Sequence, residues 1–524
     1  MTEKISKKMK VVRTSDTRVV KIHTEGKGFG MVKTGIAAVI ILAQLAFFIL
    51  LYLGLVSSVK WYFILSAVLS FICILHVLST GKPGATKCVW VLFLAICPSF
   101  GYIGYIMSSE DIFFGRLKRR YNKIFARTAE FNGENTLSDS LPKPVKNDAE
   151  FLWNSGKFKA YDNTQLKYFP SGADLFDDVI ENLLAAEKFV FIEFFIISDG
   201  KLLNGIIDIL AEKVKAGVDV RIIADGIGSH GTLSFKVRRK MKKAGIKLKF
   251  FNRIQSHFTF ALNLRDHRKI IVVDGKTAYT GGSNLADEYI NAKRMYGYWK
   301  DTGLRLKGAA VDGLTLTFLR QWEAITKEEV DYRACLNNCD MFENSSAVIP
   351  YADGKDYKYD IAKGVYDNVI AGAEEKLYIM TPYFVPDEQT FNAIANKALS
   401  GVDVRIVLPG VPDKAYVYVV TMDNAERLAK LGVKVYVMRH AFVHSKLMLS
   451  ENCATVGSVN IDLRSYFNQF ENGVYTNDTA TLEDIQKDFE YAFSASDIIG
   501  KEVARKNIFK RIIAGFLRLF SPLM

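Results

Sequence analysis

The chain has 524 residues and a formal net charge of +13. This length exceeds what one ordinary core holds, so two or more compact units are expected. The positive charge favours an acidic partner, either nucleic acid or anionic lipid, and charge alone does not separate the two. The six cysteines form no paired CxxC framework, and Cys335 and Cys339 have no matching His or Cys pair. Free thiols and no metal site are therefore predicted.

Three apolar segments follow a basic N-terminal tail, residues 1–33, and define a predicted transmembrane region at 34–107. Residues 34–56 carry no charge and are long enough to cross a hydrocarbon core of about 30 Å. Their apolar stretch is longer than that of a cleavable signal peptide, so an uncleaved anchor is favoured. The segment 61–78 is the second candidate, and the third, 88–107, is interrupted by one proline and two glycines. Two to three membrane segments are therefore expected.

Basic residues flank this region on both sides. Residues 1–33 hold nine Lys/Arg against three Asp/Glu, and 116–127, within a basic linker predicted at 108–150, holds six more Lys/Arg. Both flanks favour the cytoplasmic side, whereas three full spans would separate them. Either one segment is re-entrant or the charge bias is overridden at one end, and the sequence leaves both alternatives open.

The remainder of the chain is an internal repeat. From about residue 150, short apolar runs alternate with amphipathic ones, which is typical of strands and helices in βα order. The hexapeptide GVDVRI occurs at 217–222 and again at 401–406, and two other pairs of similar segments are offset by 187 residues. The repeat predicts two similar α/β lobes, at 151–333 and 346–498, joined by a polar link.

Each lobe carries a His-x-Lys motif followed by a carboxylate. The residues are His267, Lys269 and Asp274 in DHRKIIVVDG, and His444, Lys446 and Glu451 in VHSKLMLSEN. A single His-x-Lys would be interpreted as an exposed strand, but two copies in equivalent places of a repeat change this interpretation. Each is followed by a small-residue turn, GGSN at 281–284 and GSVN at 457–460. Strand alternation puts His and Lys on one face, which favours a phosphate site.

The pattern HxK(x4)[D/E] with a downstream G-[GS]-x-N, present twice, resembles the signature of the phospholipase D superfamily. The segments GGSNLADEY, TPYFVPDE and GSVNIDLRSYFNQFE are similar to bacterial cardiolipin synthases, and the likeness extends from about residue 60 to the C-terminus. The resemblance implies two phospholipase D-like lobes related by a pseudo-twofold axis, each a mixed sheet flanked by helices and both preceded by transmembrane helices. It further implies a multi-pass enzyme of the bacterial cell membrane with its catalytic lobes at the cytoplasmic face.

The implied activity is cardiolipin synthesis from two phosphatidylglycerol molecules through a phosphohistidine. One histidine attacks phosphorus, the other protonates the departing glycerol, and the lysines stabilise the phosphate, with no cofactor, metal or nucleic acid. His267 is favoured as the nucleophile by analogy. The resemblance also implies substrate-binding residues, Asn284, Ser458 and Asn460. The residues expected to orient the rings are Glu471 for His444 and Glu288 for His267.

One residue departs from the family pattern, because Glu451 stands where that pattern has Asp. We expect Glu451 to be structural rather than a proton carrier, since it lies five residues beyond Lys446. The alternatives to a synthase are a phospholipase D hydrolase, in which water resolves the intermediate, a nuclease, and a catalytically inactive membrane scaffold. The apolar segments disfavour the nuclease, and the two intact motifs disfavour the scaffold.

The C-terminal segment, 501–524, is predicted to be a basic amphipathic helix. Its apolar residues recur at helical spacing among six Lys/Arg and a single acidic residue, Glu502. This composition favours a helix that lies on an anionic membrane. The alternative is a terminal helix that packs its apolar face on the α/β core.

Overall fold

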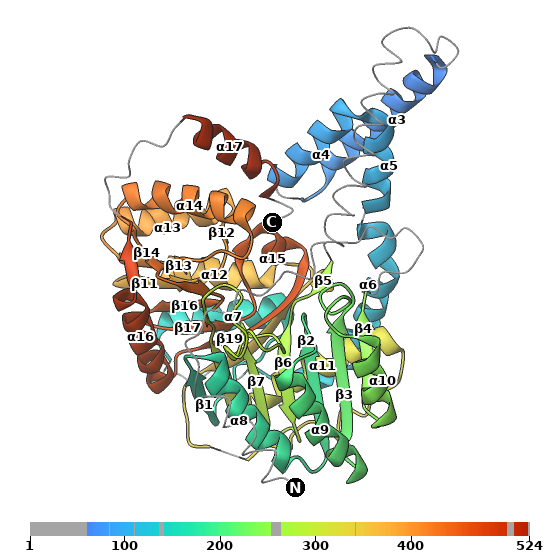
Figure 1. Cartoon of the computed structure of the whole chain (residues 1–524), viewed down its shortest axis with the longest axis vertical. Coiled ribbons are helices and arrows are strands. Elements are labelled where there is room, and N and C mark those ends of the chain that lie inside the picture. The colour runs from blue at the N-terminus through green and yellow to red at the C-terminus, as the bar shows by residue number, and fades with distance from the viewer. Residues whose placement is uncertain are drawn as a thin grey trace. The chain divides into compact units, whose positions relative to one another are not determined.

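The computed structural model describes residues 60–82, 84–108, 110–135, 141–252, 264–340, 342–499 and 508–521. The chain forms two compact units, residues 1–108 and 109–524 (Figure 1). The basic tail and the apolar segment at 34–56 lie outside the described residues, as does much of the C-terminal segment at 501–524.

The described residues of the first unit form the helices α3 (Lys60–Ser79), α4 (Gly84–Ile96) and α5 (Pro98–Ser108). Among the described residues, only α3 is long and apolar enough to cross a membrane. The third predicted segment, 88–107, is divided between α4 and α5. The division falls at Pro98, which has no N–H for a continuing helix and is favoured at a helix start. With 13 residues, α4 is about 20 Å long and too short for a full span.

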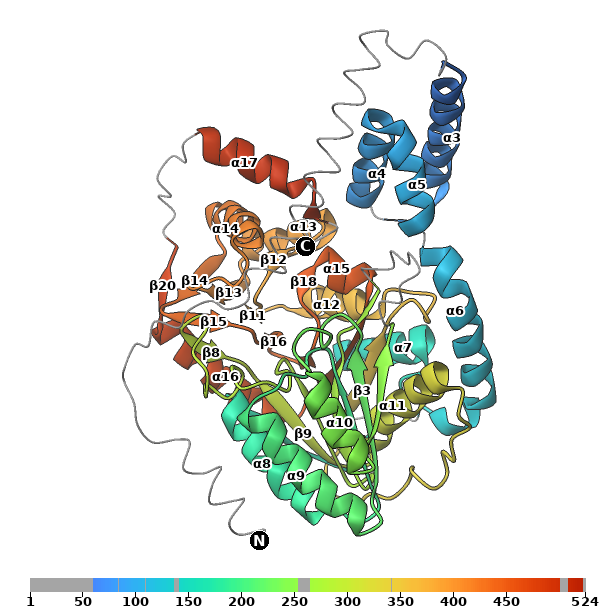
Figure 2. The ribbon, with the colours of Figure 1, turned by 45° about the vertical axis from the view of Figure 1, so that its right-hand side comes forward.

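The three helices of this unit lie side by side (Figure 2). Ser66 and Ser99 hydrogen-bond through their hydroxyl groups at 2.7 Å, and the Ser70 hydroxyl donates to the Leu94 carbonyl at 2.7 Å. A side chain at Gly101 would meet the Leu94 Cα at 2.9 Å. Small residues and buried hydroxyls are the usual means by which helices in membranes approach closely. The described residues thus give one candidate span with two shorter helices packed on it.

The second unit begins with helices that the sequence suggested only as a linker. They are α6 (Glu110–Arg127), the short 3-10 helix η3 (Ala129–Asn132) and α7 (Lys143–Gly156). Helix α6 packs on the first lobe, whereas α7 packs on the second. The Tyr475 hydroxyl of the second lobe donates to the Asp148 carboxylate of α7 at 2.7 Å. Helices α6 and α7 of the predicted linker therefore pack on different lobes.

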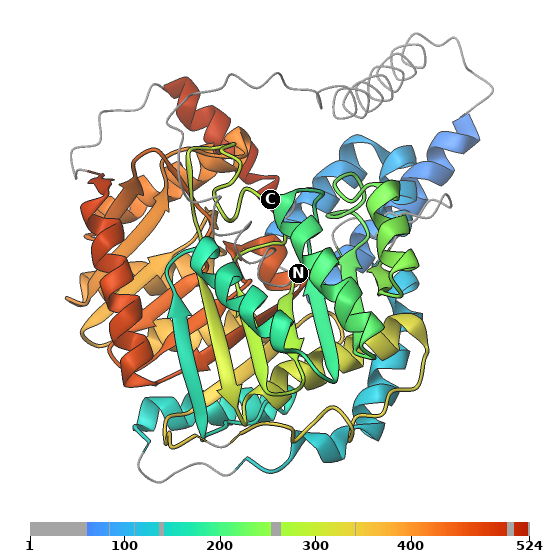
Figure 3. The ribbon, with the colours of Figure 1, turned by 60° about the horizontal axis from the view of Figure 1, so that its bottom comes forward.

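The first lobe contains a seven-stranded mixed sheet in the order β1-β9-β7-β6-β2-β3-β4. Its strands are β1 (Thr164–Phe169), β2 (Phe189–Phe194), β3 (Asp219–Asp225), β4 (Lys247–Phe251), β6 (Lys269–Val273), β7 (Thr277–Gly281) and β9 (Gly303–Gly308). Its helices are α8 (Gly172–Ala185), α9 (Lys201–Lys215), α10 (Phe235–Lys243) and α11 (Val311–Thr326). Helices α8 and α9 cover one face of the sheet and α11 the other (Figure 3).

The second lobe repeats this sheet strand for strand and adds one edge strand, in the order β10-β19-β17-β16-β11-β13-β14-β20. Its strands are β10 (Val348–Asp353), β11 (Lys376–Met380), β13 (Asp403–Pro409), β14 (Lys434–Met438), β16 (Leu447–Ser450), β17 (Ala454–Gly457), β19 (Gln469–Thr476) and β20 (Ser496–Ile498). Its helices are α12 (Ile361–Gly372), α13 (Glu388–Leu399), α14 (Ala415–Lys430), α15 (Leu463–Phe467), α16 (Thr479–Ser494) and α17 (Ile508–Arg518). The predicted α/β repeat with mixed sheets is thereby confirmed.

Short strands cross from each lobe to the other. They are β5 (Arg265–Asp266), which pairs with β19, and β8 (Tyr298–Lys300), which pairs with β15 (Ala441–Val443). A third short pair, β12 (Phe384–Val385) with β18 (Ile461–Asp462), lies within the second lobe. Because both crossings are parallel and occupy equivalent places in the repeat, the lobes exchange segments reciprocally.

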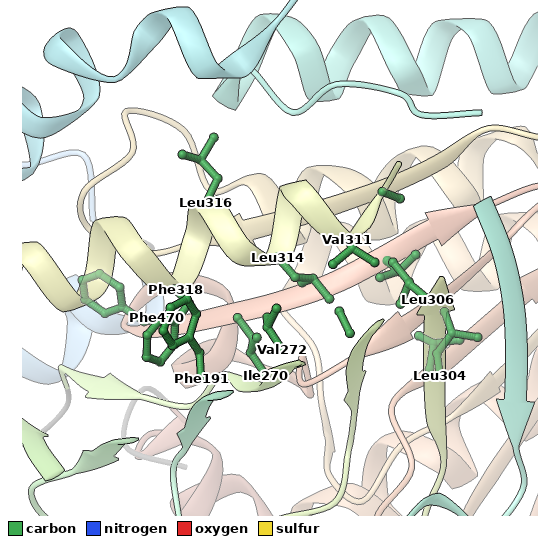
Figure 4. Packing of buried hydrophobic residues seen from close by; sticks show 14 of the residues in the cluster. Phe191, Ile270, Val272, Leu304, Leu306, Val311, Leu314, Leu316, Phe318 and Phe470 are labelled. Carbon is green, nitrogen blue, oxygen red and sulfur yellow. The ribbon is translucent and has the colours of Figure 1, made fainter. Parts of the chain in front are cut away.

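A continuous apolar core joins the lobes (Figure 4). Phe191 of β2 stacks on Phe318 of α11 with ring centroids 4.8 Å apart, and Phe470 of β19 belongs to the same buried cluster. Helix α11 contacts the first sheet and also β10 of the second lobe. The two lobes therefore share one hydrophobic core and fold as a single body.

Candidate active site

The His-x-Lys motifs lie at the two crossings between the lobes. His267 follows β5, and its backbone N–H donates to the Phe470 carbonyl of the second lobe at 2.8 Å. His444 follows β15, and its N–H donates to the Lys300 carbonyl of the first lobe at 2.7 Å. A continuous strand through each motif was expected. Instead each histidine stands at a break, because the chain leaves the pairing across the lobes and enters its own sheet two residues after His267 and three residues after His444.

Each histidine ring is held by a carboxylate from the opposite lobe. Nδ1 of His267 lies 2.9 and 3.0 Å from the two carboxylate oxygens of Glu471. Nδ1 of His444 lies 2.7 Å from an Asp301 oxygen. Glu471 and Asp301 are fully buried. In both pairs Nδ1 is engaged, which leaves Nε2 of each ring for the chemistry.

These contacts change the expected partners. Glu471 was expected to orient His444 and instead contacts His267, because β19 pairs with the strand that leads into His267. Asp301 follows β8 in the segment WKDTG and was not predicted. Glu288 is the partner of neither ring, since both Nδ1 atoms are taken. The only sequence signal for Asp301 was its place within the long stretch, from about residue 60 to the C-terminus, over which the chain resembles cardiolipin synthases.

Aromatic rings support both imidazoles. Phe195 lies edge-on to His267 with centroids 5.1 Å apart, and Tyr289 lies edge-on to His444 at 5.2 Å. The Asn284 side-chain amide donates to the Tyr289 hydroxyl at 2.7 Å. Asn284 thus positions the ring that packs on His444.

The other predicted substrate-binding residues have different surroundings. The Ser458 hydroxyl donates to the Glu471 carboxylate and accepts from the Asn472 N–H at 2.9 Å. It therefore fixes the carboxylate that holds His267. The Asn460 side-chain oxygen is buried and has no hydrogen-bond partner within the described part of the chain. Of the three predicted residues, Asn460 is the one with a buried side-chain oxygen that lacks a partner among the described residues.

The two lysines are buried beside the histidines. Nζ of Lys269 donates to the His267 carbonyl at 2.5 Å. Nζ of Lys446 donates to the His444 carbonyl and lies 2.9 Å from Nδ1 of the same ring. Burial lowers the pKa of Lys269 to about 8 and that of Lys446 to about 7. A bound anion would supply the missing counter-charge and favour both protonated lysines.

Burial and the lysine charges also shift the pKa values of the two histidines. Burial and the positive charges of Lys269 and Lys446 hold the pKa of His267 well below its usual range. Burial and Lys446 lower the pKa of His444 to about 4, although Asp301 opposes this shift. Each histidine is sensitive to the lysines of both lobes, which indicates that the two motifs form one site.

The two carboxylates differ in charge state. Burial raises the pKa of Glu471 to about 8, although Lys269 and the Ser458 hydroxyl oppose the shift. Burial also opposes ionisation of Asp301, but His444, Lys446 and the Thr302 N–H outweigh it and hold its pKa below the usual value. Asp301 is therefore anionic near neutral pH, whereas Glu471 readily carries a proton. The repeat is symmetric in its backbone and asymmetric in its electrostatics.

Helix α6 supports the strand that carries Glu471, the carboxylate that holds His267. The Phe470 ring lies 5.9 Å from the rings of both Phe114 and Tyr121, which belong to α6. On its other side the Arg268 guanidinium lies 5.1 Å from the Phe470 centroid. Phe470 precedes Glu471 in β19, so these contacts help to fix the position of that carboxylate.

Asp274 and Glu451 lie away from the histidines, at the far ends of β6 and β16. The Asp274 carboxylate accepts the backbone N–H groups of residues 187–189 at 2.7 to 2.9 Å. Glu451 accepts those of residues 374–376 at 2.8 to 3.3 Å. The structure therefore does not bring these two predicted catalytic residues to the reaction centre. Both anchor the start of the neighbouring strand, β2 or β11, and their contacts are equivalent.

Glu451→Asp is expected to keep activity within about twofold, because the carboxylate is retained and no contact to the histidines is involved. Glu451→Ala leaves three N–H groups without their acceptor and should lower the free energy of unfolding by about 1 kcal/mol. Turnover and thermal unfolding of the two variants check both statements. Loss of activity in Glu451→Asp at an unchanged unfolding temperature would give this residue a role in the reaction.

Two histidines and two lysines, delivered by equivalent turns of a repeated α/β fold and oriented across the lobes, define a phosphodiester-transfer site of the phospholipase D type. A family model described as "Cardiolipin synthase, PLD-like domain" matches residues 179–295 and 366–493. The crystal structure of phosphatidylserine synthase from Haemophilus influenzae aligns with a TM-score of 0.56 at 15% identity, over 73% of this chain and 98% of that one. This likeness shows a shared fold.

Close relatives in sequence are more specific. The chain is 31% identical over 507 residues to a cardiolipin synthase of Alkalihalophilus pseudofirmus, covering 92% of this chain and 99% of the relative. It is 30% identical over 461 residues to a cardiolipin synthase of Staphylococcus aureus, covering 83% and 90%. An uncharacterized protein of Streptococcus mutans is 34% identical over 457 residues, covering 86% and 99%. The chain belongs to the cardiolipin synthase family and is a phosphatidyltransferase.

Proposed function

We propose that the enzyme transfers a phosphatidyl group from one phosphatidylglycerol molecule to a second, forming cardiolipin and releasing glycerol. The observation that carries the proposal is the pair of histidines, each held through Nδ1 by a carboxylate of the opposite lobe. A double displacement at phosphorus needs two such groups, one to bond to phosphorus and one to transfer protons.

In the first step, Nε2 of His267 attacks the phosphorus of phosphatidylglycerol. The bond between phosphorus and the glycerol oxygen breaks, and that oxygen takes the proton from Nε2 of His444. Glycerol leaves, and the phosphatidyl group remains on His267. In the second step, the glycerol hydroxyl of another phosphatidylglycerol attacks phosphorus while His444 accepts its proton. The bond to His267 breaks and cardiolipin is released.

The roles of the two histidines follow from the two carboxylates. An anionic Asp301 stabilises the imidazolium form of His444, which suits the proton donor. Glu471 has a raised pKa and stabilises an imidazolium less, which suits a neutral, nucleophilic His267. The bound phosphodiester raises the proton affinity of His444 and of both lysines, since it brings a negative charge into a buried, positive site.

The lysines act on the phosphate oxygens. Lys269 and Lys446 enter from opposite lobes, so their charges stabilise the negative charge that develops on the equatorial oxygens during both steps. Asn460, whose side-chain oxygen has no hydrogen-bond partner among the described residues, can present its NH2 group to the phosphate from the side of the second lobe. These groups bind donor and intermediate alike, which explains why one site serves both half-reactions.

The purified enzyme is expected to convert labelled phosphatidylglycerol into cardiolipin and glycerol in equal amounts. Because lysines provide the charge stabilisation, the yield should be the same with excess chelator. Lipid and headgroup analysis of one reaction checks both statements. Phosphatidic acid as the main product would instead identify a hydrolase, and loss of activity on chelation that one metal restores would refute the role given to the lysines.

We further propose that the first unit is a multi-pass anchor in the bacterial cell membrane with the catalytic lobes at the cytoplasmic face. Helix α3 supplies one span and the segment predicted at 34–56 a second, so a re-entrant hairpin of α4 and α5 keeps both basic flanks on one side. Reporter fusions after residues 82 and 135 should therefore both report the cytoplasm. Reports from opposite sides would mean that α4 and α5 cross the membrane.

A further inference from the structure

The C-terminal helix α17 packs on the second lobe through only one of its faces. Ala514 and Ser521 are buried, and Leu517 is half-buried against the apolar cluster of Val385, Val417 and Val420. Arg518 forms an ion pair with Asp423 of α14. The buried positions recur at spacings of three and four residues, as one face of a helix does. Figure 2 shows α17 lying beside α14.

The other face of α17 is apolar and has no cover within the described residues. It consists of Ile513 and Phe516 together with Leu519 and Phe520 of the turn that follows the helix, and we call these four residues the docking face. Their side chains are 38 to 59% exposed. The rings of Phe516 and Phe520 contact each other at 5.3 Å, so they form one patch. Helix α14 exposes two further large apolar residues, Tyr416 and Val419. A patch of this size on one helix marks an interaction surface.

The docking face is joined rigidly to the candidate active site. Leu517, on the opposite side of α17, packs in the cluster that contains Val385 of β12. Strand β12 pairs with β18, which directly follows Asn460. Near the start of α14, Nζ of Lys414 donates to the Tyr383 hydroxyl at 2.8 Å, and that hydroxyl donates to Asp413 at 2.6 Å. Whatever α17 binds is thereby held close to the turn that presents Asn460.

The positive charge of the C-terminal segment indicates what kind of partner the docking face binds. Residues 501–524 contain six Lys/Arg and one acidic residue. An apolar strip among cations suits the interface of an anionic bilayer, where each Lys or Arg near the surface contributes about 1 kcal/mol. A symmetric contact between two copies of this segment would need complementary acidic residues within it, and the segment has only Glu502. The pattern therefore favours lipid over self-association.

We propose that the docking face inserts into the surface of an anionic bilayer and holds the catalytic lobes where lipid headgroups enter the site. The inference rests on the proposed function only for the identity of the lipid. It adds a second attachment to the membrane, separate from the N-terminal unit, and this attachment belongs to the catalytic body itself.

The test uses the full chain in vesicles and a tryptophan placed on the docking face. Phe516→Trp is compared with Tyr491→Trp, which lies on α16 and is similarly exposed at 56%. Emission of the unsubstituted protein is subtracted. With brominated acyl chains in vesicles of phosphatidylglycerol and phosphatidylcholine, Phe516→Trp should be blue-shifted and quenched, and Tyr491→Trp should be neither. In pure phosphatidylcholine the quenching should be weaker.

Other outcomes would overturn the proposal. Solvent-like, unquenched emission of Phe516→Trp in both kinds of vesicle would exclude insertion. A blue shift without quenching that grows with the protein-to-lipid ratio would assign the face to contact between copies of the chain. The measurement needs no turnover, so it is repeated in His267→Ala. Quenching in His267→Ala without product would show that docking is independent of catalysis. Normal product without quenching in the otherwise unchanged Phe516→Trp enzyme would refute docking and leave the proposed function intact.

A kinetic measurement tests the consequence. The double change Ile513→Asp and Phe516→Asp should raise the mole fraction of lipid that gives half-maximal rate by about tenfold or more, since two apolar side chains no longer enter the bilayer. The value of kcat should stay near that of the parent, because neither residue touches the site. An unchanged lipid dependence at unchanged stability would contradict the proposal.

Discussion

Replacing His267 or His444 by alanine is expected to lower cardiolipin synthesis by roughly 10⁴-fold or more, because each ring acts in both half-reactions. The double variant should be no slower than the slower single variant, since groups that act as one unit do not lose activity additively. Turnover of radiolabelled phosphatidylglycerol measures all three. His444→Ala should still accumulate some phosphatidyl-enzyme with an activated leaving group, which needs no proton, whereas His267→Ala should not.

The matched control is His230→Ala, which changes an exposed histidine of the first lobe outside the His-x-Lys motifs. It should keep activity within about twofold. Both active-site rings are buried, so thermal unfolding is measured for every variant, and His267→Asn and His444→Asn serve as more conservative changes. Near-normal turnover in a folded variant of either histidine would exclude a site shared by the two lobes.

The repeat was predictable because it leaves a periodic signal along the chain. GVDVRI recurs in β3 and β13, and the two sheets follow the same strand order. Each motif could be placed at equivalent points of the two lobes for the same reason. The internal repeat therefore made it possible to predict both the fold and the four residues His267, Lys269, His444 and Lys446.

The exchange between lobes left no comparable signal. Strand β5 has two residues and β8 has three, and their partners lie more than 140 residues away in the chain. Such short pairings have no hydrophobic period. Without them Glu471 appears to belong to the histidine of its own lobe, and Asp301 is one acidic residue among many. The helices within the predicted linker at 108–150 were not indicated for a similar reason, since the contacts of α6 and α7 are to distant segments.

The apolar segments show a different limit of prediction from the sequence. The pattern at 61–78 and the helix α3 agree closely. In contrast, the apolar composition of 88–107 does not reveal that Pro98 divides the segment into two helices, each too short to cross a membrane. For the C-terminal segment the two alternatives proved to be compatible, because one face of α17 packs on α14 while the other is exposed. The amphipathic pattern indicates that a helix has an apolar face but does not tell whether protein or lipid covers it.

Replacing the carboxylates is expected to have the second largest effect. Asp301→Asn and Glu471→Gln should each lower kcat by about 10² to 10⁴-fold, as for other carboxylates that orient a catalytic histidine. The two variants should differ in pH dependence. The pKa of Glu471 is raised to about 8, so its anion, which accepts the His267 Nδ1 proton, is the minor form at neutral pH. The kcat of the parent should therefore rise as the pH increases through the pKa of Glu471.

Glu471→Gln should lack this alkaline rise, since glutamine does not titrate. Asp301→Asn should be slower at every pH but keep the rise, because the pKa of Asp301 lies below its usual value and it remains ionised throughout the range. Saturating lipid keeps both lysines protonated, so kcat reports the carboxylates rather than Lys269 and Lys446. Glu288→Gln, a change at an acidic residue that holds neither ring, is the control and should resemble the parent. A normal rate in Glu471→Gln, or loss of the alkaline rise in Asp301→Asn, would mean that the carboxylates do not divide the two roles between the histidines.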